Sequence, residues 1–179
     1  ENRLALMRRL AASVGACVTT TYDGKLILVR VAFGTPSGTI DTINMVDGSF
    51  GPIGRPSVRG AIRLAGERNW SPNSQSLAAA ISISQLPILR DEWIYLSGTD
   101  ETVRVNWYQS AKPDAIETLM VVESDITTEI ARLVALWKTP HTIFGFDGYA
   151  ETFQHEIGAT VTLTHPRFGC SGGVTALVV

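Results

Sequence analysis

The dipeptide Asp23-Gly24 constrains the fold more than any other short feature of this 179-residue chain. It separates two runs rich in β-branched and apolar residues, ACVTTTY and KLILVRV. Asp-Gly favours a tight turn with positive φ angles, and such a turn joins two antiparallel strands. The sequence therefore predicts a β-hairpin here, and an antiparallel rather than a parallel sheet.

Two other stretches have the period of two that is typical of strands. From Val58 to Leu64, apolar residues alternate with Arg59 and Arg63, which predicts a half-buried strand with one wet, basic face. From Val161 to His165 the same alternation leads into a glycine-rich turn, and the apolar pattern resumes at Val174. Strands are expected on both sides of that turn.

A second hairpin is expected where DEWIYLS and ETVRVNWYQSA flank Gly98-Thr99-Asp100, because both flanks are rich in aromatic and β-branched residues. The stretch FGTPSGTIDTINMVDGSFGPIGRPS spreads Gly, Pro, Ser and Asp among short apolar runs. It is expected to be a loop-rich connector with one short strand near Ile40 to Ile43.

Apolar residues recur at helical spacing in two places. The first stripe consists of Leu4, Met7, Leu10, Ala11 and Val14. The second consists of Ile126, Ile130, Leu133, Leu136 and Trp137. Gly15 and Pro140 follow the two stripes and are expected to end the helices, and Ser124 or Asp125 is expected to cap the second one.

Together these patterns predict an α+β fold with mainly antiparallel β structure, barrel-like or sandwich-like, with two or three short helices. Residues 1–55 are expected to form an N-terminal segment of helix, hairpin and connector. Residues 56–179 are expected to form a β-rich domain with one helix near 124–138. The chain starts without Met and stops inside the apolar run VTALVV, so we expect it to be an excerpt of a longer protein.

Composition narrows the class of protein. With 45% hydrophobic and 18% charged residues, the chain has the composition of a folded protein rather than a disordered tail. A net charge of -2 gives no broad electrostatic surface for nucleic acid. The apolar runs are too short to span a bilayer. Two cysteines, Cys17 and Cys170, do not make a disulfide framework.

Two short motifs suggest chemistry, and neither is complete. FGCSGG around Ser171 is close to the loop of a serine-protease nucleophile, but a nucleophile needs a base and a residue that orients the base. The histidines are His141, His155 and His165, and no Asp follows in this region. HEIGA lacks the second His of the zinc-peptidase signature. The sequence therefore predicts a turn at Ser171 and no catalytic residue, metal ligand or cofactor.

Aromatic and basic residues supply the candidate contact surface. Trp70, Trp93, Trp107 and Trp137 are the tryptophans, and Trp137 is expected in the core. A basic cluster consists of Arg55, Arg59, Arg63 and Arg68. The predicted interface consists of Arg59, Arg63, Arg68, Asn69 and Trp70. The alternative is that the arginines lie on a solvated strand face and that the aromatic rings pack within the fold.

The order of these segments resembles the tail hub proteins of long-tailed bacteriophages and prophages, which are also called tail tip or baseplate hub proteins. The resemblance runs through RRLAASVGACVTTTYDGKLIL, GERNWSPNSQSLA, ETLMVVESDITTEIARLVALW and EIGATVTLTHPRFGCSGG, and covers most of residues 4–31 and 59–179. The chain departs from the family pattern before Arg68, where a tyrosine is common, and at Ala159, where an acidic residue is common.

The resemblance implies a structural role in a virion tail, assembled in the cytoplasm of a bacterial host. It implies a homotrimer of the full-length protein that connects the tail tube and distal tail proteins to the tape measure protein and the receptor-binding apparatus, without nucleic acid or membrane insertion. Two alternatives remain. One is a hydrolase domain acting on cell walls, with acidic residues drawn from Glu92, Asp100, Glu101, Asp147 and Glu151. The other is a carbohydrate-binding β module, favoured if Trp70 and Trp93 are exposed on one face.

Overall fold

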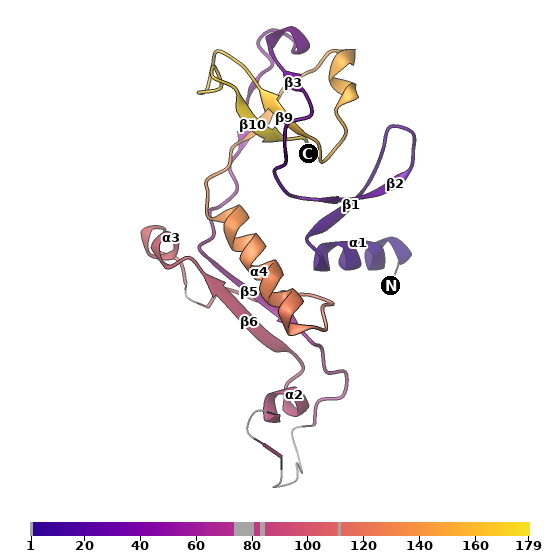
Figure 1. Ribbon diagram of the computed structural model, residues 1–179, viewed down its shortest axis with the longest axis vertical. Coiled ribbons are helices and arrows are strands. Elements are labelled where there is room, and N and C mark those ends of the chain that lie inside the picture. The colour runs from indigo at the N-terminus through magenta and orange to yellow at the C-terminus, as the bar shows by residue number, and fades with distance from the viewer. Residues whose placement is uncertain (1, 74–80, 83–84, 111) are drawn as a thin grey trace. The chain divides into compact units, whose positions relative to one another are not determined.

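A computed structural model describes residues 2–73, 81–82, 85–110 and 112–179, and these divide into two compact units (Figure 1). The first unit contains Glu1–Val14 and Ser57–Thr139, and the second contains Gly15–Pro56 and Pro140–Val179. Each unit is therefore built from two separate stretches of chain. The sequence suggested contiguous segments 1–55 and 56–179 instead, because hydrophobic periodicity does not reveal which distant stretches pack together.

The sheet of the first unit has the strand order β6-β5-β7. These strands are β5 (Ala61–Gly66), β6 (Ile94–Thr99) and β7 (Ile116–Glu117). β5 pairs antiparallel with β6 and parallel with β7. The strand expected from Val58 to Leu64 thus begins and ends slightly later than its pattern indicated, and its position between two partners explains why its apolar residues are buried.

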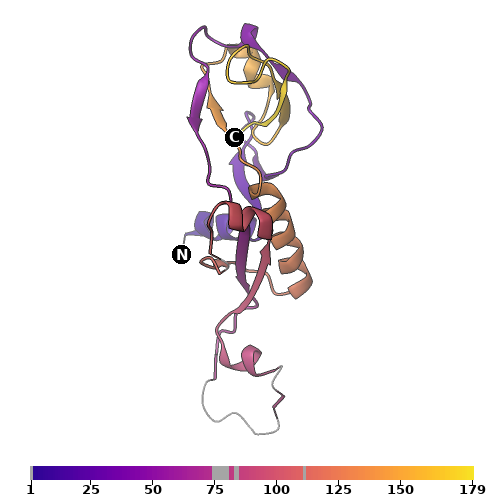
Figure 2. The same ribbon diagram turned by 90° about the vertical axis from the view of Figure 1, so that its left-hand side faces the viewer.

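Helix α4 (Glu123–Trp137) packs along β5 and β6, as Figure 2 shows. Ile62 and Leu64 of β5 form a buried cluster with Ile126 and Ile130 of α4. The helix predicted from the second apolar stripe is therefore confirmed, and Trp137 packs against this cluster as expected. Its N-cap is Val122, one residue before the helix, rather than Ser124 or Asp125.

Two glycines bring α4 close to the sheet. A Cβ atom at Gly66 would lie 2.3 Å from Cδ1 of Ile126, and a Cβ at Gly98 would lie 2.4 Å from Cγ2 of Ile130. Both separations are shorter than a carbon–carbon contact allows. Gly98 therefore serves helix packing, and the hairpin predicted across Gly98-Thr99-Asp100 is wrong.

The chain after β6 turns into helix α3 (Glu101–Asn106) instead of a strand. The reason is local, because the side chain of Asp100 accepts a hydrogen bond from the backbone N–H of Val103 at 3.2 Å and caps the helix. The other helices of this unit are α1 (Arg3–Ser13) and α2 (Leu86–Arg90). α1 is confirmed, and it ends before Gly15, whose φ is 67°.

The second unit contains the predicted hairpin, which is confirmed. β1 (Ala16–Thr20) and β2 (Leu26–Arg30) pair antiparallel on either side of Gly24, whose φ is 77°. A three-stranded sheet has the order β10-β9-β3, with β3 (Thr39–Ile40), β9 (Thr160–Leu163) and β10 (Val174–Leu177). A further pair consists of β4 (Gly51–Gly54) and β8 (Ile143–Gly145), and two 3-10 turns span Thr42–Asn44 and Ala150–Gln154.

The core of the second unit is a cluster of six buried residues, Ile40, Met45, Phe50, Val161, Leu163 and Cys170. The predicted alternation before the glycine-rich turn is confirmed by β9, and the predicted resumption at Val174 is confirmed by β10. The α+β class with mainly antiparallel strands is thus confirmed. The described strands form small separate sheets, and no barrel closes among them.

Candidate protein interface

The segment Arg68-Asn69-Trp70 follows β5 and contains an exposed aromatic ring, that of Trp70. The guanidinium of Arg68 lies 4.1 Å from the ring centre of Trp70 and 5.0 Å from that of Trp93. Its Nη2 also donates a hydrogen bond of 2.7 Å to Oε1 of Glu92. Arg68 therefore joins two indole rings and one carboxylate, an arrangement that fixes the Trp70 ring.

Asn69 fixes the backbone beside this group. Its side-chain Nδ2 donates to the carbonyl oxygens of Ile88 and Leu89 at 3.0 and 3.2 Å, and its Oδ1 accepts from the backbone N–H of Ser71 at 3.0 Å. Asn69 thereby ties the loop to α2. The resemblance to hub proteins includes residues 74–78, which lie outside the described residues.

The two tryptophans next to Arg68 differ in their exposure. Trp70 is 72% exposed, whereas Trp93 is only 7% exposed. The condition set for a carbohydrate-binding module, with both rings exposed on one face, is not met. Trp70 is a single exposed ring on a rigid support, which is the usual form of an anchor at a protein interface.

Arg59 and Arg63, the other predicted contact residues, line a shallow groove of about 340 Å³ in the first unit. Arg63 lies in β5 and its guanidinium stands 4.2 Å from the ring centre of Tyr95 in β6. Ile62 and Leu64 of β5 face α4, so the alternate residue Arg63 lies on the opposite face of the sheet. The predicted wet, basic face is not found as a whole, because Ala61 and Ala65 on the same face of the strand are buried. Arg63 alone is partly exposed within the strand, and Arg59 precedes it.

One wall of the groove contains Gln109, which follows an exposed turn formed by Trp107 and Tyr108. The turn ends α3 with two hydrogen bonds, from N–H of Tyr108 to O of Val105 at 3.1 Å and from N–H of Gln109 to O of Arg104 at 2.9 Å. This pattern places the residue before Gln109 in the left-handed conformation and normally favours glycine there. Tyr108 occupies that position, with a φ of 51° and a side chain that is 97% exposed.

Arg104 and Gln109 hold this turn against the chain that leads into β5. Arg104 donates two hydrogen bonds to the carboxylate of Glu101 and one, of 3.0 Å, to the carbonyl of Gln109. Gln109 accepts from N–H of Gly60 at 2.6 Å and donates to the carbonyl of Val58. The hydrogen bond from Arg104 lowers the pKa of Glu101 below its ordinary value.

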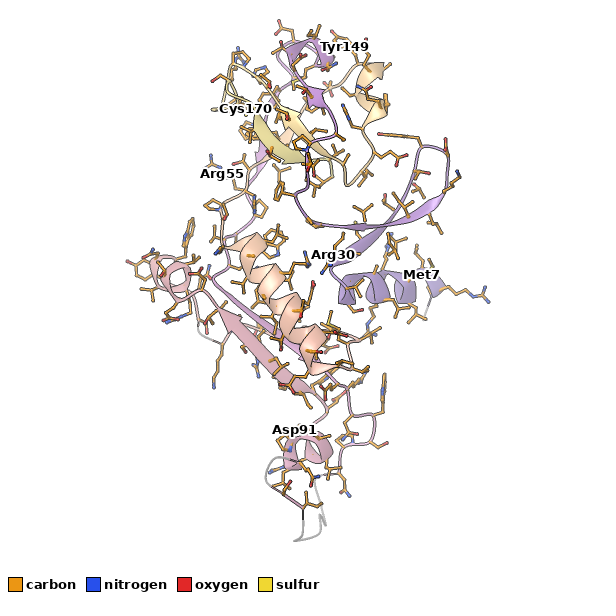
Figure 3. All side chains as sticks on the ribbon, in the orientation of Figure 1. Met7, Arg30, Arg55, Asp91, Tyr149 and Cys170 are labelled. Atoms are coloured by element: carbon orange, nitrogen blue, oxygen red, sulfur yellow. The ribbon has the colours of Figure 1, made fainter. Side chains whose placement is uncertain are left out.

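The turn between β9 and β10 contains the cysteine and serine of the protease-like motif. Figure 3 labels Cys170, which is 1% exposed, and burial raises the pKa of its thiol. Nδ1 of His165 accepts a hydrogen bond from the backbone N–H of Arg167 at 3.1 Å, so this nitrogen is engaged within the turn. In this turn Phe168, Gly169 and Gly173 adopt positive φ.

The carboxylates named for a hydrolase have structural partners in most cases. Glu92 pairs with Arg68, Asp100 caps α3 and lies 3.5 Å from Nζ of Lys138, and Glu101 pairs with Arg104. Glu151 accepts a hydrogen bond from Nδ2 of Asn44 at 3.3 Å in the second unit. Asp147 lies in the second unit as well, so the five residues are divided between the two units.

Within residues 2–73, 81–82, 85–110 and 112–179, no group of three His, Cys, Asp or Glu side chains is placed to hold a metal ion. In the same part of the chain, none of the helices has both the length and the apolar character needed to span a bilayer. Both cysteines are free thiols, with Cys17 exposed and Cys170 buried.

Comparisons of this chain with protein families, with curated proteins and with solved structures found no match. The candidate surface therefore depends on the geometry described above. Sequence reasoning named Arg59, Arg63, Arg68, Asn69 and Trp70 but missed Trp107 and Tyr108. The signal that would have found them is Asp100, whose capping side chain converts the expected strand into a helix that ends in an exposed turn.

Proposed function

We propose that this chain is a structural part of a tail hub protein of a long-tailed bacteriophage or prophage, acting through protein contacts and not as an enzyme. The tail assignment is supported by the order of the sequence segments quoted above, from the first helix to the turn at Ser171. The structural role is supported independently by the exposed apolar side chains described next.

Large apolar side chains lie at the surface of both units. In the first unit, Trp70 is 72% exposed, and Met7, labelled on α1 in Figure 3, is also exposed. In the second unit, Leu28 is 67% and Ile53 is 74% exposed. Large apolar side chains that stay exposed on a small domain favour a surface that other proteins cover in an assembly. This exposure is the observation that carries the proposed role.

In this role the full-length protein forms a homotrimer at the end of the tail. It contacts the tail tube and distal tail proteins on one side, and the tape measure protein and receptor-binding apparatus on the other. Such a ring closes through heterologous contacts, in which one patch meets a different patch on the neighbouring subunit. The protein functions in the virion tail after assembly in the host cytoplasm.

The test uses the full reading frame, coexpressed with the tail tube and distal tail proteins of the same phage. Mass photometry should detect a trimer that joins both partners in one complex. Tail tube protein from an unrelated phage serves as the control and should not join. A full-length monomer that fails to bind either cognate partner would refute the hub assignment.

A further inference from the structure

We infer that the groove beside Arg59 and Arg63 binds an extended, acidic segment of a partner protein, with Trp107 and Tyr108 as an apolar anchor beside it. This inference goes beyond the proposed function, because it names the chemistry of the bound segment. It depends on the first unit alone and holds whether or not the chain belongs to a phage tail.

The first step of the argument is the uncompensated charge of the groove. Three other arginines of the first unit, Arg68, Arg104 and Arg132, each pair with a glutamate. Arg59 and Arg63 have no ion pair with any residue in the part of the chain that the structure describes. They lie in a chain whose net charge is -2. A local excess of positive charge on an acidic protein favours an acidic partner.

The second step concerns the orientation of these cations. The guanidinium of Arg63 lies over the ring of Tyr95, which restricts its rotation while leaving its N–H donors available. Asp114 is the acidic residue that lines the same groove, so the lining keeps an excess of one positive charge. Arginine binds carboxylates with two parallel hydrogen bonds, which makes glutamate or aspartate side chains suitable ligands.

The third step is the rigidity of the groove wall. Gln109 binds the chain at Val58 and Gly60 through its side-chain amide, and Arg104 binds the carbonyl of Gln109. A wall held in this way loses little conformational entropy on binding. This wall of the groove is therefore preorganised for ligand binding.

The fourth step is the turn next to this wall. Trp107 is 53% and Tyr108 is 97% exposed, and Tyr108 adopts a backbone conformation that glycine would adopt more easily. A tyrosine that strains the backbone and packs so little within its own fold is explained if its ring contacts a partner. Tryptophan, tyrosine and arginine are the residues most enriched at the energetic centres of interfaces.

The mixed lining favours a peptide over other anions. Pro113 and Ile116 bring apolar surface to the groove, and a nucleic acid backbone or an inorganic anion would leave this surface unused. Two arginines also form too small a basic surface for strong binding to a nucleic acid, which depends on many phosphate contacts. An acidic segment with apolar residues between its carboxylates satisfies both kinds of lining.

The test is a binding measurement on the 179-residue chain. The probe is a fluorescein-labelled peptide of four Glu-Pro-Val repeats, and its control has Gln in place of each Glu. Fluorescence anisotropy should show binding of the Glu peptide that weakens with added salt, and at least tenfold weaker binding of the Gln peptide. The double variant Arg59→Glu and Arg63→Glu should bind the Glu peptide at least tenfold more weakly than the unchanged chain.

The matched control is the double variant Arg3→Glu and Arg8→Glu, which makes the same charge change at exposed positions of α1. It should bind within about twofold of the unchanged chain. Trp107→Ala with Tyr108→Ala should weaken binding several-fold. Amide NMR spectra of each variant establish that the fold is intact. Arg63→Gln serves as a milder second variant if the charge reversal unfolds the chain.

Three results would overturn the inference. The first is no binding of the Glu peptide at millimolar concentration. The second is equal weakening by the groove variant and the α1 variant, which would indicate general charge attraction. The third is tighter binding of heparin or duplex DNA at the same arginines, which would assign the groove to a different class of partner. The assay contains no tail protein, so its outcome is separate from that of the assembly test.

Discussion

The strained backbone at Tyr108 leads to a quantitative prediction for the variants Tyr108→Gly and Tyr108→Ala. Its φ of 51° costs an L-residue about 1–2 kcal/mol, whereas glycine avoids this cost. Glycine instead loses more backbone entropy on folding, and this loss offsets roughly 0.5–1 kcal/mol of the strain that it relieves. Since the Tyr108 ring is 97% exposed, its removal alone changes little. Tyr108→Gly should therefore be about 0.5–1 kcal/mol more stable than Tyr108→Ala, and Tyr108→Ala should lie close to the unchanged chain.

The assay is urea unfolding followed by tryptophan fluorescence. The chain has four tryptophans, Trp70, Trp93, Trp107 and Trp137, and they all lie in Ser57–Thr139 of the first unit. The signal consequently reports on the unit that contains Tyr108. For a slope of about 1–3 kcal/mol per molar urea, the midpoint of Tyr108→Gly should exceed that of Tyr108→Ala by roughly 0.5 M. Equal midpoints would refute the idea that the turn is strained.

Phe168 supplies a contrasting case in the second unit. Its φ of 58° is similar, but its ring centre lies 5.8 Å from that of Phe50 and 6.4 Å from that of Phe144. Here the left-handed conformation is offset by aromatic packing within the fold. Phe168→Gly should therefore lower the melting temperature measured by circular dichroism, and an increase would contradict this assignment of the ring to packing.

Three other predictions concern packing and side-chain reactivity. Gly98→Ala should destabilise the first unit by about 1–3 kcal/mol in the same urea assay, because the new Cβ would lie 2.4 Å from Cγ2 of Ile130; an unchanged midpoint would show that α4 shifts freely. Cys17 should react rapidly with a thiol reagent at neutral pH. Cys170 should react only after unfolding, because it is buried and its raised pKa reduces the thiolate fraction; equal rates in the folded chain would contradict this. Ser171 should not react with a fluorophosphonate probe, and rapid stoichiometric labelling there would overturn its assignment to a turn.

The parts of the fold that the sequence predicts are those fixed by local chemistry. Gly24 makes the first hairpin recognisable because it supplies the positive φ that the turn requires. The stripe from Ile126 to Trp137 predicts α4 because its spacing fits one face of a helix. The failure at Gly98 has a physical cause as well, since a glycine can mark either a turn or a close approach between two elements. The helix that requires this glycine lies about thirty residues later in the chain, so no local pattern could distinguish the two.

The candidate interface was predictable in its arginines but not in its aromatic residues. The alternation around Arg63 shows that this side chain avoids the core, whatever it contacts. The tryptophans give no such signal, because Trp70 and Trp93 have the same chemistry and flank the same arginine, yet one is exposed and the other buried. Both rings contact Arg68, so their different exposure depends on how distant elements pack around them, which no local pattern indicates.

An amphipathic pattern indicates that an apolar face is to be covered, but it does not indicate which molecule covers it. The first stripe of the chain shows this distinction. Leu4, Met7 and Leu10 of α1 follow helical spacing, and the helix forms as predicted, yet these side chains remain 41–51% exposed in the isolated chain. The stripe on α4 has the same spacing and is covered by β5 and β6 of its own unit. Ala11 of the α1 stripe is buried within the chain, whereas its larger members are not, so the same spacing is compatible with cover from the chain itself or from the partners proposed above.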